Sequence, residues 1–307
     1  MVQTLEAMRG RIDSAKDLYS VVRVMKALAA SNIRQCEKAV EALKEYSRTI
    51  EDGLQVLLRK SSAEISSDLG SGKRWGVVIF GSDQGMCGSF NEQIAHFAMD
   101  EMKRLSSNPR DVTVLVVGMR VIGRLEDGGY SIAEELMVPS TVNNITARVN
   151  DLLLLIEQFR YQHNVNQFLL IHNRPLPPAS FAPHKRQLLP VDPEWLKEIS
   201  HRKWNSRSLP TFTMDWHQLF SLTIRQHLFT TLYRAFAESM AGENSSRLAS
   251  MQAAEKNIES HLSELTMQYH QKRQQSITEE LLDIVAGFET LTQESRSTRK
   301  LERRANE

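Results

Sequence analysis

The stretch QTLEAMRGRIDSAKDLYSVVRVMKALAASNIRQCEKAVEALKEYSRTIEDGLQVLLRKS, residues 3–61, contains no proline, and its apolar residues recur at steps of three and four. This spacing predicts one helix with a continuous apolar seam. The seam consists of Leu5, Met8, Ile12, Ala15, Val22, Met25, Ala29, Ile33, Cys36, Val40, Leu43, Ile50, Leu54 and Leu57. Such a helix is about 80 Å long, so it needs an equally long partner to cover its seam.

A second proline-free stretch follows Pro210 and reaches the last residue. We expect a helix to begin near Met214 or Trp216, because apolar residues then recur at helical spacing. Its later seam consists of Met251, Ala254, Ile258, Leu262, Leu265, Tyr269, Leu281, Ile284, Phe288 and Leu291. The economical arrangement is an antiparallel coiled coil in which each terminal helix covers the seam of the other.

Small residues are concentrated in both predicted helices, at Met25–Ser31 and at Ser239–Glu255. Small side chains allow two helix backbones to approach closely, so we predict tight packing there, with Cys36 in the core. On the outer face of this pair we expect four basic side chains to point away from the partner helix, namely Lys26, Arg34, Arg247 and Lys256.

The residues between the two helices change to the pattern of an α/β domain. We predict strands at 75–80, 111–118 and 168–172, and helices at 90–105 and 143–161. Strands that alternate with helices indicate a largely parallel sheet. The expected fold class is therefore α/β, with a long antiparallel coiled coil of N- and C-terminal helices flanking a Rossmann-like α/β domain.

Prolines are concentrated near the end of this middle region, where six of the nine lie between Pro175 and Pro193. Because proline cannot donate to a sheet, we expect a hairpin or an edge strand there. The predicted domains are an N-terminal coiled-coil helix at 1–62, an α/β domain at 63–212, and a C-terminal coiled-coil helix with a basic tail at 213–307.

The composition favours a soluble intracellular protein with no nucleic-acid partner. Lysine and arginine number 38 against 37 acidic residues, so no strong field favours nucleic acid or an anionic membrane. Two cysteines provide no disulfide framework and no metal cluster. No apolar run approaches the roughly 20 residues that span a bilayer, and the first residues lack the apolar region of a signal peptide.

The loop GSDQGMCGS, Gly81–Ser89, follows a predicted strand and precedes a helix. Such a loop can hold a phosphate on its backbone N–H groups, but it lacks the Lys-Ser/Thr pair of a P-loop, so a tight turn above the sheet is the alternative. Cys87 suits either a reactive thiolate or a packing residue. The histidines show no ligand spacing, so we predict no metal, no cofactor and no active site, although an enzyme that uses this loop and a self-associating coiled-coil scaffold both stay open.

The polar segment Gln271–Glu280 interrupts the second seam, as either a register device or a partner surface. Three motifs then resemble the gamma subunits of rotary F-type ATP synthases: MKALAASNIR (25–34), SDQGMCGSFN (82–91) and SITEELLDIVAG (276–287). The chain departs from the family at Phe288, where the family has alanine, and at Met86, where it has leucine. The amino end and a basic tail resemble the sodium-type bacterial forms; the tail contains Arg296, Arg299, Lys300, Arg303 and Arg304.

The resemblance implies a central-stalk rotor that couples ion flow, of protons or sodium, to ATP synthesis or hydrolysis without being catalytic itself. The implied partners are the alpha and beta subunits of the catalytic head, the epsilon subunit and the c-subunit ring. Membrane contact would occur only through the c ring, at the cytoplasmic face of the bacterial inner membrane. The resemblance also implies a polar catch for the beta subunits, formed by Arg273, Gln274, Thr278 and Glu280, with Met25 and Lys26 opposite them near an acidic loop of beta.

Overall fold

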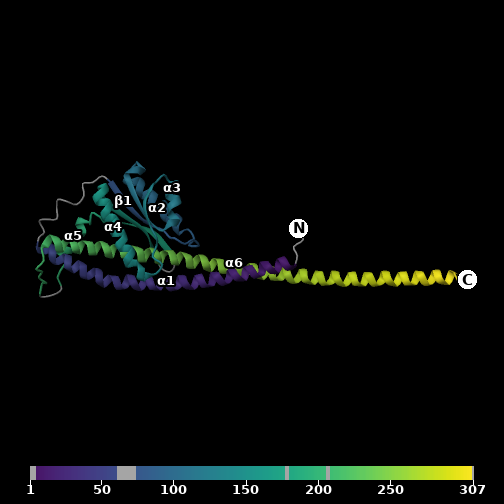
Figure 1. Cartoon of the computed structure of the whole chain (residues 1–307). Coiled ribbons are helices and arrows are strands. Elements are labelled where there is room, and N and C mark those ends of the chain that lie inside the picture. The colour runs from purple at the N-terminus through teal and green to yellow at the C-terminus, as the bar shows by residue number, and fades with distance from the viewer. Residues whose placement is uncertain (1–4, 61–73, 177–179, 205–207, 306–307) are drawn as a thin grey trace. The chain divides into compact units, whose positions relative to one another are not determined.

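The computed structural model describes residues 5–60, 74–176, 180–204 and 208–305, with side chains described as far as residue 288. The chain forms two compact units, a central unit of residues 25–251 and a terminal unit of residues 1–24 and 252–307. Helix α1 (Leu5–Lys60) and helix α6 (Trp216–Ala305) contribute to both units, which confirms the two very long terminal helices (Figure 1). In the described part of the chain, no helix is long and apolar enough to cross a membrane.

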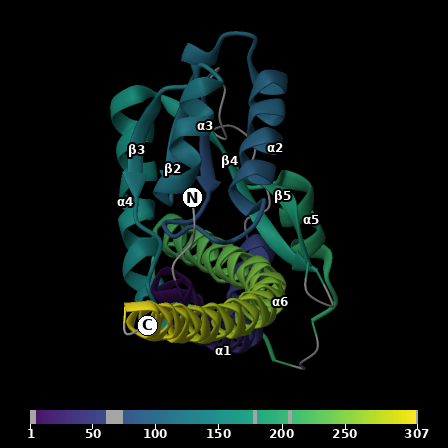
Figure 2. The same ribbon diagram turned by 90° about the vertical axis from the view of Figure 1, so that its right-hand side faces the viewer.

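A five-stranded sheet forms the centre of the central unit (Figure 2). Its strands are β1 (Arg74–Phe80), β2 (Val112–Val117), β3 (Ile132–Leu136), β4 (Val165–Leu176) and β5 (Ser180–Leu189). They lie in the order β3-β2-β1-β4-β5; the first four are parallel, and β5 is antiparallel to β4 at one edge. The largely parallel sheet and the hairpin in the proline-rich region are thus confirmed.

Helices cover both faces of this sheet. They are α2 (Phe90–Leu105), α3 (Ile122–Asp127), α4 (Ile145–His163) and α5 (Pro193–His201). Val77 and Ile79 of β1 pack with α2 and α3, whereas Val78 and Phe80 pack with α4 and α6, because alternate residues of a strand point to opposite faces. The predicted helices at 90–105 and 143–161 are confirmed, while α3, β3 and α5 were not predicted.

In the central unit, α1 packs along α6 on one face of the sheet. The seam residues Ala29 and Cys36 are 1% and 0% exposed, and Asn32 Nδ2 donates a hydrogen bond to Asn244 Oδ1 (3.4 Å). All residues of α6 from Ser239 to Arg247 are buried. The tight packing predicted from the small residues is therefore confirmed.

In the terminal unit, the first part of α1 lies antiparallel to α6. The seam residues Met8, Ile12 and Leu265 are buried, and Tyr19 Oη donates a hydrogen bond to Glu259 Oε1 (2.8 Å). The antiparallel coiled coil predicted from the two seams is thus present in this unit.

The last part of the predicted seam is not covered by α1, and this prediction was wrong. Leu281, Ile284 and Phe288 are 58%, 69% and 72% exposed, and the side chain of Leu291 lies outside the described set. The reason is the register of the pair. With Tyr19 opposite Glu259, the first turn of α1 lies near Arg273, so no described residue of α1 reaches Leu281.

Candidate functional site

The predicted catch residues of α6 lie on the surface of the terminal unit. Arg273, Gln274, Thr278 and Glu280 are all exposed. Residues seven apart share a helix face, so Arg273 and Glu280 present a cation and an anion on the same side. Thr278 Oγ1 donates to the backbone carbonyl of Gln274 (2.9 Å). The charged groups and the Gln274 amide are therefore displayed toward solvent.

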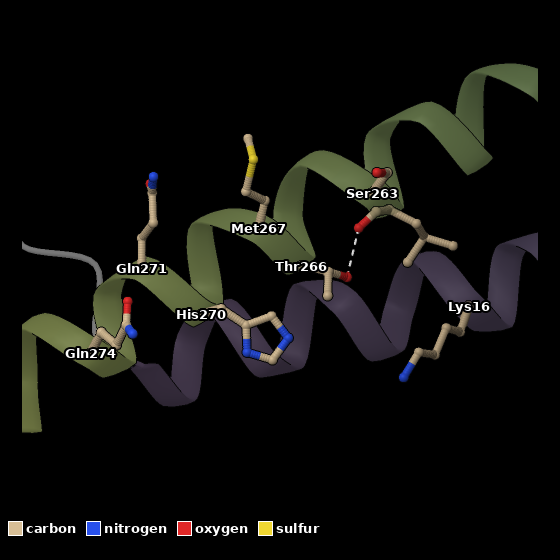
Figure 3. A pocket seen from close by; sticks show the side chains of 8 residues that line it. Lys16, Ser263, Thr266, Met267, His270, Gln271 and Gln274 are labelled. Atoms are coloured by element: carbon tan, nitrogen blue, oxygen red, sulfur yellow. Dashed lines mark hydrogen bonds between the residues drawn. The ribbon is translucent and has the colours of Figure 1, made fainter.

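An open groove between α1 and α6 adjoins these residues (Figure 3) and has a volume of about 620 Å³. It is lined by Lys16 of α1 and by Leu262, Ser263, Thr266, Met267, His270, Gln271 and Gln274 of α6. These eight lining residues include a lysine and two glutamines but no acidic side chain. The groove therefore suits a partner that supplies hydrogen-bond acceptors, such as carboxylates or backbone carbonyls.

Lys16 is the cation of the groove, and it is held only loosely. Its Nζ lies 3.7 Å from Asp13 Oδ1, and both side chains are more than half exposed. Exposed pairs of this kind contribute about 0–1 kcal/mol, so Lys16 can turn to an incoming carboxylate at little cost. Nearby, the hydrogen bond to Glu259 raises the pKa of Tyr19, which keeps that phenol protonated as a donor.

Met25 and Lys26, the predicted residues of α1, belong to the central unit and are half-buried. The residues of α1 that accompany segment 271–280 within the terminal unit come from positions 5–24. A shared role of Met25 and Lys26 with the α6 residues stays a prediction.

Sequence reasoning missed Lys16 and His270 as members of the groove. A signal was present, because Ser263, His270 and Gln274 recur on α6 at steps of seven and four, the spacing of one helix face. Lys16 gave no comparable signal, since its position depends on the register of α1 against α6.

The glycine-rich loop Gly81–Ser89 is docked on α6 in the central unit. The buried Arg247 places Nη2 2.7 Å from Glu243 Oε1 and 3.3 Å from each backbone carbonyl oxygen of Gln84 and Gly85. Ser246 Oγ donates to the carbonyl oxygen of Cys87 (2.5 Å). We call this loop together with Glu243, Ser246 and Arg247 the loop–helix latch.

The latch corrects the prediction that Arg247 points outward, because Arg247 is 6% exposed. The loop covers this face of α6 and supplies the carbonyl oxygens that a buried guanidinium requires. Burial also raises the pKa of Glu243, and the neighbouring Arg247 opposes that rise. Arg34 and Lys256 are exposed as expected, and Lys26 is half-buried.

The contacts of the loop favour the tight turn over a phosphate cradle. A cradle presents backbone N–H groups to its ligand, whereas this loop turns carbonyl oxygens toward Arg247, and the N–H of Ser82 is bonded to Asn91 Oδ1 (3.0 Å). The Asp83 carboxylate accepts from the N–H groups of Met119 (3.0 Å) and Val138 (2.8 Å). Asp83 thereby joins the loops that follow β1, β2 and β3.

Both cysteines are packing residues in the structure. Cys87 is 2% exposed, and its Sγ lies 3.6 Å from Ser82 Oγ and 3.5 Å from Asn91 Nδ2. Burial raises the pKa of Cys36 to about 12, with a smaller contribution from Glu243. The Cys36 thiol is therefore protonated at neutral pH and inert as a nucleophile.

Comparisons with known proteins cover almost the whole chain. A family model described as ATP synthase matches residues 4–291. The chain is 28% identical over 300 residues to the ATP synthase gamma chain of Granulibacter bethesdensis, covering 94% of this chain and 99% of the relative. It is 27% identical over 319 residues to the ATP synthase gamma chain of Nostoc punctiforme, with the same two shares covered.

Solved structures share the fold. The rotor of the Euglena gracilis mitochondrial ATP synthase matches with a TM-score of 0.60 and 15% identity, covering 89% of this chain and 98% of that chain. The central stalk and c ring of the Tetrahymena thermophila mitochondrial ATP synthase matches with a TM-score of 0.53 and 19% identity, covering 76% of this chain and 99% of that chain. At these identities the likeness concerns the fold alone.

Proposed function

The chain belongs to the ATP synthase gamma-chain family, and we propose that segment 271–280 of α6 is where it passes rotation to the catalytic head. As a member of this family it is the central-stalk subunit of an F-type ATP synthase and takes part in ATP synthesis. In our proposal the chain is not itself catalytic, and its work is mechanical coupling between ion flow and the nucleotide sites of other subunits.

The proposed partners are the alpha and beta subunits of the head, which would surround α1 and α6, and the epsilon subunit and c ring, which would bind the α/β domain. Support comes from the matching solved structures, which are those of an ATP synthase rotor and of a central stalk with its c ring. We further propose that the chain sits at the cytoplasmic face of the bacterial inner membrane and meets the membrane only through the c ring. The bacterial sources of the curated relatives support that location.

One observation supports the proposed catch. Four residues are exposed beside a groove that has no acidic residue in its lining: Arg273, Gln274, Thr278 and Glu280. An exposed charge or amide of this segment forms a hydrogen bond only with a conformation of the beta subunit that presents a complementary group to it. Hydrogen bonds to charged groups contribute about 1.5–3 kcal/mol. Two such bonds made with one conformer and not another would bias the equilibrium between open and closed beta subunits, which is what coupling requires.

The test is a double variant, Arg273→Ala with Gln274→Ala, in the assembled complex. We expect ATP synthesis driven by an ion gradient to fall by at least about ten-fold, the equivalent of one lost bond of 1.4 kcal/mol, while the chain folds and assembles. The matched control is Gln268→Ala, an exposed glutamine on the same helix that bonds Glu264 (3.2 Å), and it should keep the parent rate. Full coupled synthesis by the double variant would contradict the catch and leave the family assignment unaffected.

A further inference from the structure

One turn of α6, Glu238–Gly242, lies directly on β4 in the central unit. A Cβ added at Gly242 would lie 3.4 Å from the backbone carbonyl oxygen of Asn173, so the helix approaches this strand to van der Waals distance. At the start of the same turn, Glu238 Oε2 lies 2.9 Å from His172 Nε2, and the two side chains are 12% and 4% exposed. The contact between the sheet and α6 therefore contains a buried pair of titratable groups.

A second imidazole lies beside this pair on β5. His184 is opposite His172 in the antiparallel register, and the two ring centroids are 5.5 Å apart in an edge-to-face arrangement. His172 donates from Nε2 to Glu238, since an ionised carboxylate can only accept. Its other nitrogen, Nδ1, is buried and makes no hydrogen bond within the described part of the chain. We call Glu238, His172 and His184, which join α6, β4 and β5, the Glu–His–His cluster.

Permanent charges surround the cluster. Each of three arginines lies two strand residues or one helical turn from a member of the cluster, and therefore on the same face of its element. They are Arg174 on β4, Arg186 on β5 and Arg234 on α6. Two carboxylates oppose this positive charge, namely Glu238 itself and Glu51 of α1, which acts on Arg186. Any further positive charge is added to a site where cations already outnumber anions.

Acid acts on this cluster through His184 first. Burial, followed by the charges of His172 and Arg174, lowers the pKa of His184. A histidine with a lowered pKa takes up its proton more readily when the site is open. Its contribution to the closed contact is therefore present at neutral pH and is lost as pH falls from about 6.5 towards the lowered value.

Glu238 acts in the same direction in stronger acid. Burial acts to raise the pKa of Glu238, but the hydrogen bond and the charge of His172 lower it overall. The stabilisation from this carboxylate is present above its ordinary pKa of 4.5 and is lost as pH falls through the lowered value. Both groups thus favour separation of the sheet from α6 in acid.

We propose that the Glu–His–His cluster makes the attachment of the sheet to α6 sensitive to acid, so that proton uptake between pH 7 and pH 5.5 loosens β4 and β5 from α6. All three residues lie within the central unit, so the proposal goes beyond the proposed role of segment 271–280 and does not depend on it. Where the chain couples rotation as proposed, the same loosening weakens the connection between the α/β domain and the shaft helix in an acidified cell.

The experiment measures amide hydrogen exchange of the full chain at pH 7 and pH 5.5, with each rate divided by the intrinsic rate at that pH. We expect the protection of residues 182–188 and 234–242 to fall by about three-fold to eight-fold. About eight-fold is the limit for one imidazole of pKa 6.5 that gains its proton only when the contact opens. Residues 112–117 of β2, in the same sheet, serve as the internal reference and should change by less than about two-fold.

Two variants assign the effect to the cluster. His184→Gln should reduce the acid response of residues 234–242 to less than about two-fold, because the titrating group is gone. Glu238→Gln should loosen the same residues already at pH 7, since it keeps an amide at this position but removes the charge. The matched control is His96→Gln, an exposed histidine of α2, which should retain the acid response of the parent chain.

Cooperative melting of each variant near the parent temperature shows that it is folded. If Glu238→Gln fails this check, His184→Gln still decides the matter, because His184 is only half-buried. An equal fall in protection of β2 and of residues 234–242 would show global loosening and would overturn the proposal. The proposal is also overturned if His184→Gln keeps the full acid response of the parent chain.

Discussion

Replacing Arg247 with methionine should strongly destabilise the central unit. The change keeps an unbranched side chain but removes the guanidinium, the cation of the loop–helix latch. The side chains of Arg247 and Glu243 are 7% and 9% exposed, with Nη2 and Oε1 2.7 Å apart. Removing one partner of a buried ion pair costs about 3–5 kcal/mol, because the other charge stays buried and unpaired.

We expect the free energy of unfolding to fall by an amount at the lower end of that range, about 3 kcal/mol at pH 7. Burial has already raised the pKa of Glu243, so this carboxyl group can take up a proton when Arg247 is removed. The double variant Arg247→Met with Glu243→Gln should recover part of the loss, since no buried charge then stays unpaired. A smaller loss in the double variant than in the single one is thus part of the prediction.

Urea unfolding followed by tryptophan fluorescence measures this loss. The chain has four tryptophans, and all of them lie in the central unit, so the signal reports that unit alone. The control is Arg225→Met, whose partner Glu157 lies 3.0 Å away with both side chains more than a third exposed. This variant should lose at most about 1 kcal/mol. A loss from Arg247→Met no larger than that of the control would refute the reasoning.

Two further changes act in the central unit. Gly118→Ala should abolish or severely weaken folding, because Gly118 has φ +98° and an added Cβ would lie 2.7 Å from backbone atoms of Gly81 and Ser82. The control is Gly123→Ala, where an added Cβ would meet no atom within 4 Å. Its melting temperature should match or exceed that of the parent chain. The pKa of His227 is lowered from 6.5 to about 4, so the unfolded chain protonates first and stability is lost as pH falls through this window. His227→Gln should therefore lose less stability than the parent between pH 7 and pH 5, and equal losses in urea midpoint would count against this interpretation.

Periodicity alone predicted the long elements correctly. The spacing of Met8, Ile12 and Cys36 requires a helix with a buried seam, because no other backbone places residues three and four apart on one side. The run at 75–80 is too short for a helix and is flanked by glycine, which indicates a buried strand. These patterns depend only on residues close in sequence, so they can be recognised without knowing which segment the helix or strand packs against.

The missed elements are short and carry weak patterns. β3 has the sequence IAEEL and lies at the edge of the sheet, where three of its five residues are exposed. Its identity as a strand comes from hydrogen bonding to β2 rather than from an apolar pattern. α5 has nine residues and begins directly at Pro193 after the proline-rich region.

For the candidate site, the catch segment was found from its polar interruption and its family motif, and its role stays a prediction. Arg247 was placed on the wrong face, because its position on α6 allowed either solvent or the Gly81–Ser89 loop as a neighbour. The i, i+4 pair of Glu243 and Arg247 was visible in the sequence, but nothing local indicated that a loop about 160 positions earlier would bury it.

The sequence by itself determined that one long helix precedes an α/β region and another follows it, because seam spacing and the absence of proline are local properties of the chain. Only the tertiary structure decided where α1 stops covering α6, since that depends on the register of Tyr19 against Glu259. The same holds for the groove beside Gln274 and for the docking of the Gly81–Ser89 loop on Arg247. Both arise where segments distant in sequence meet, and the energies that align such segments are set by packing and charge across the contact rather than by either segment alone.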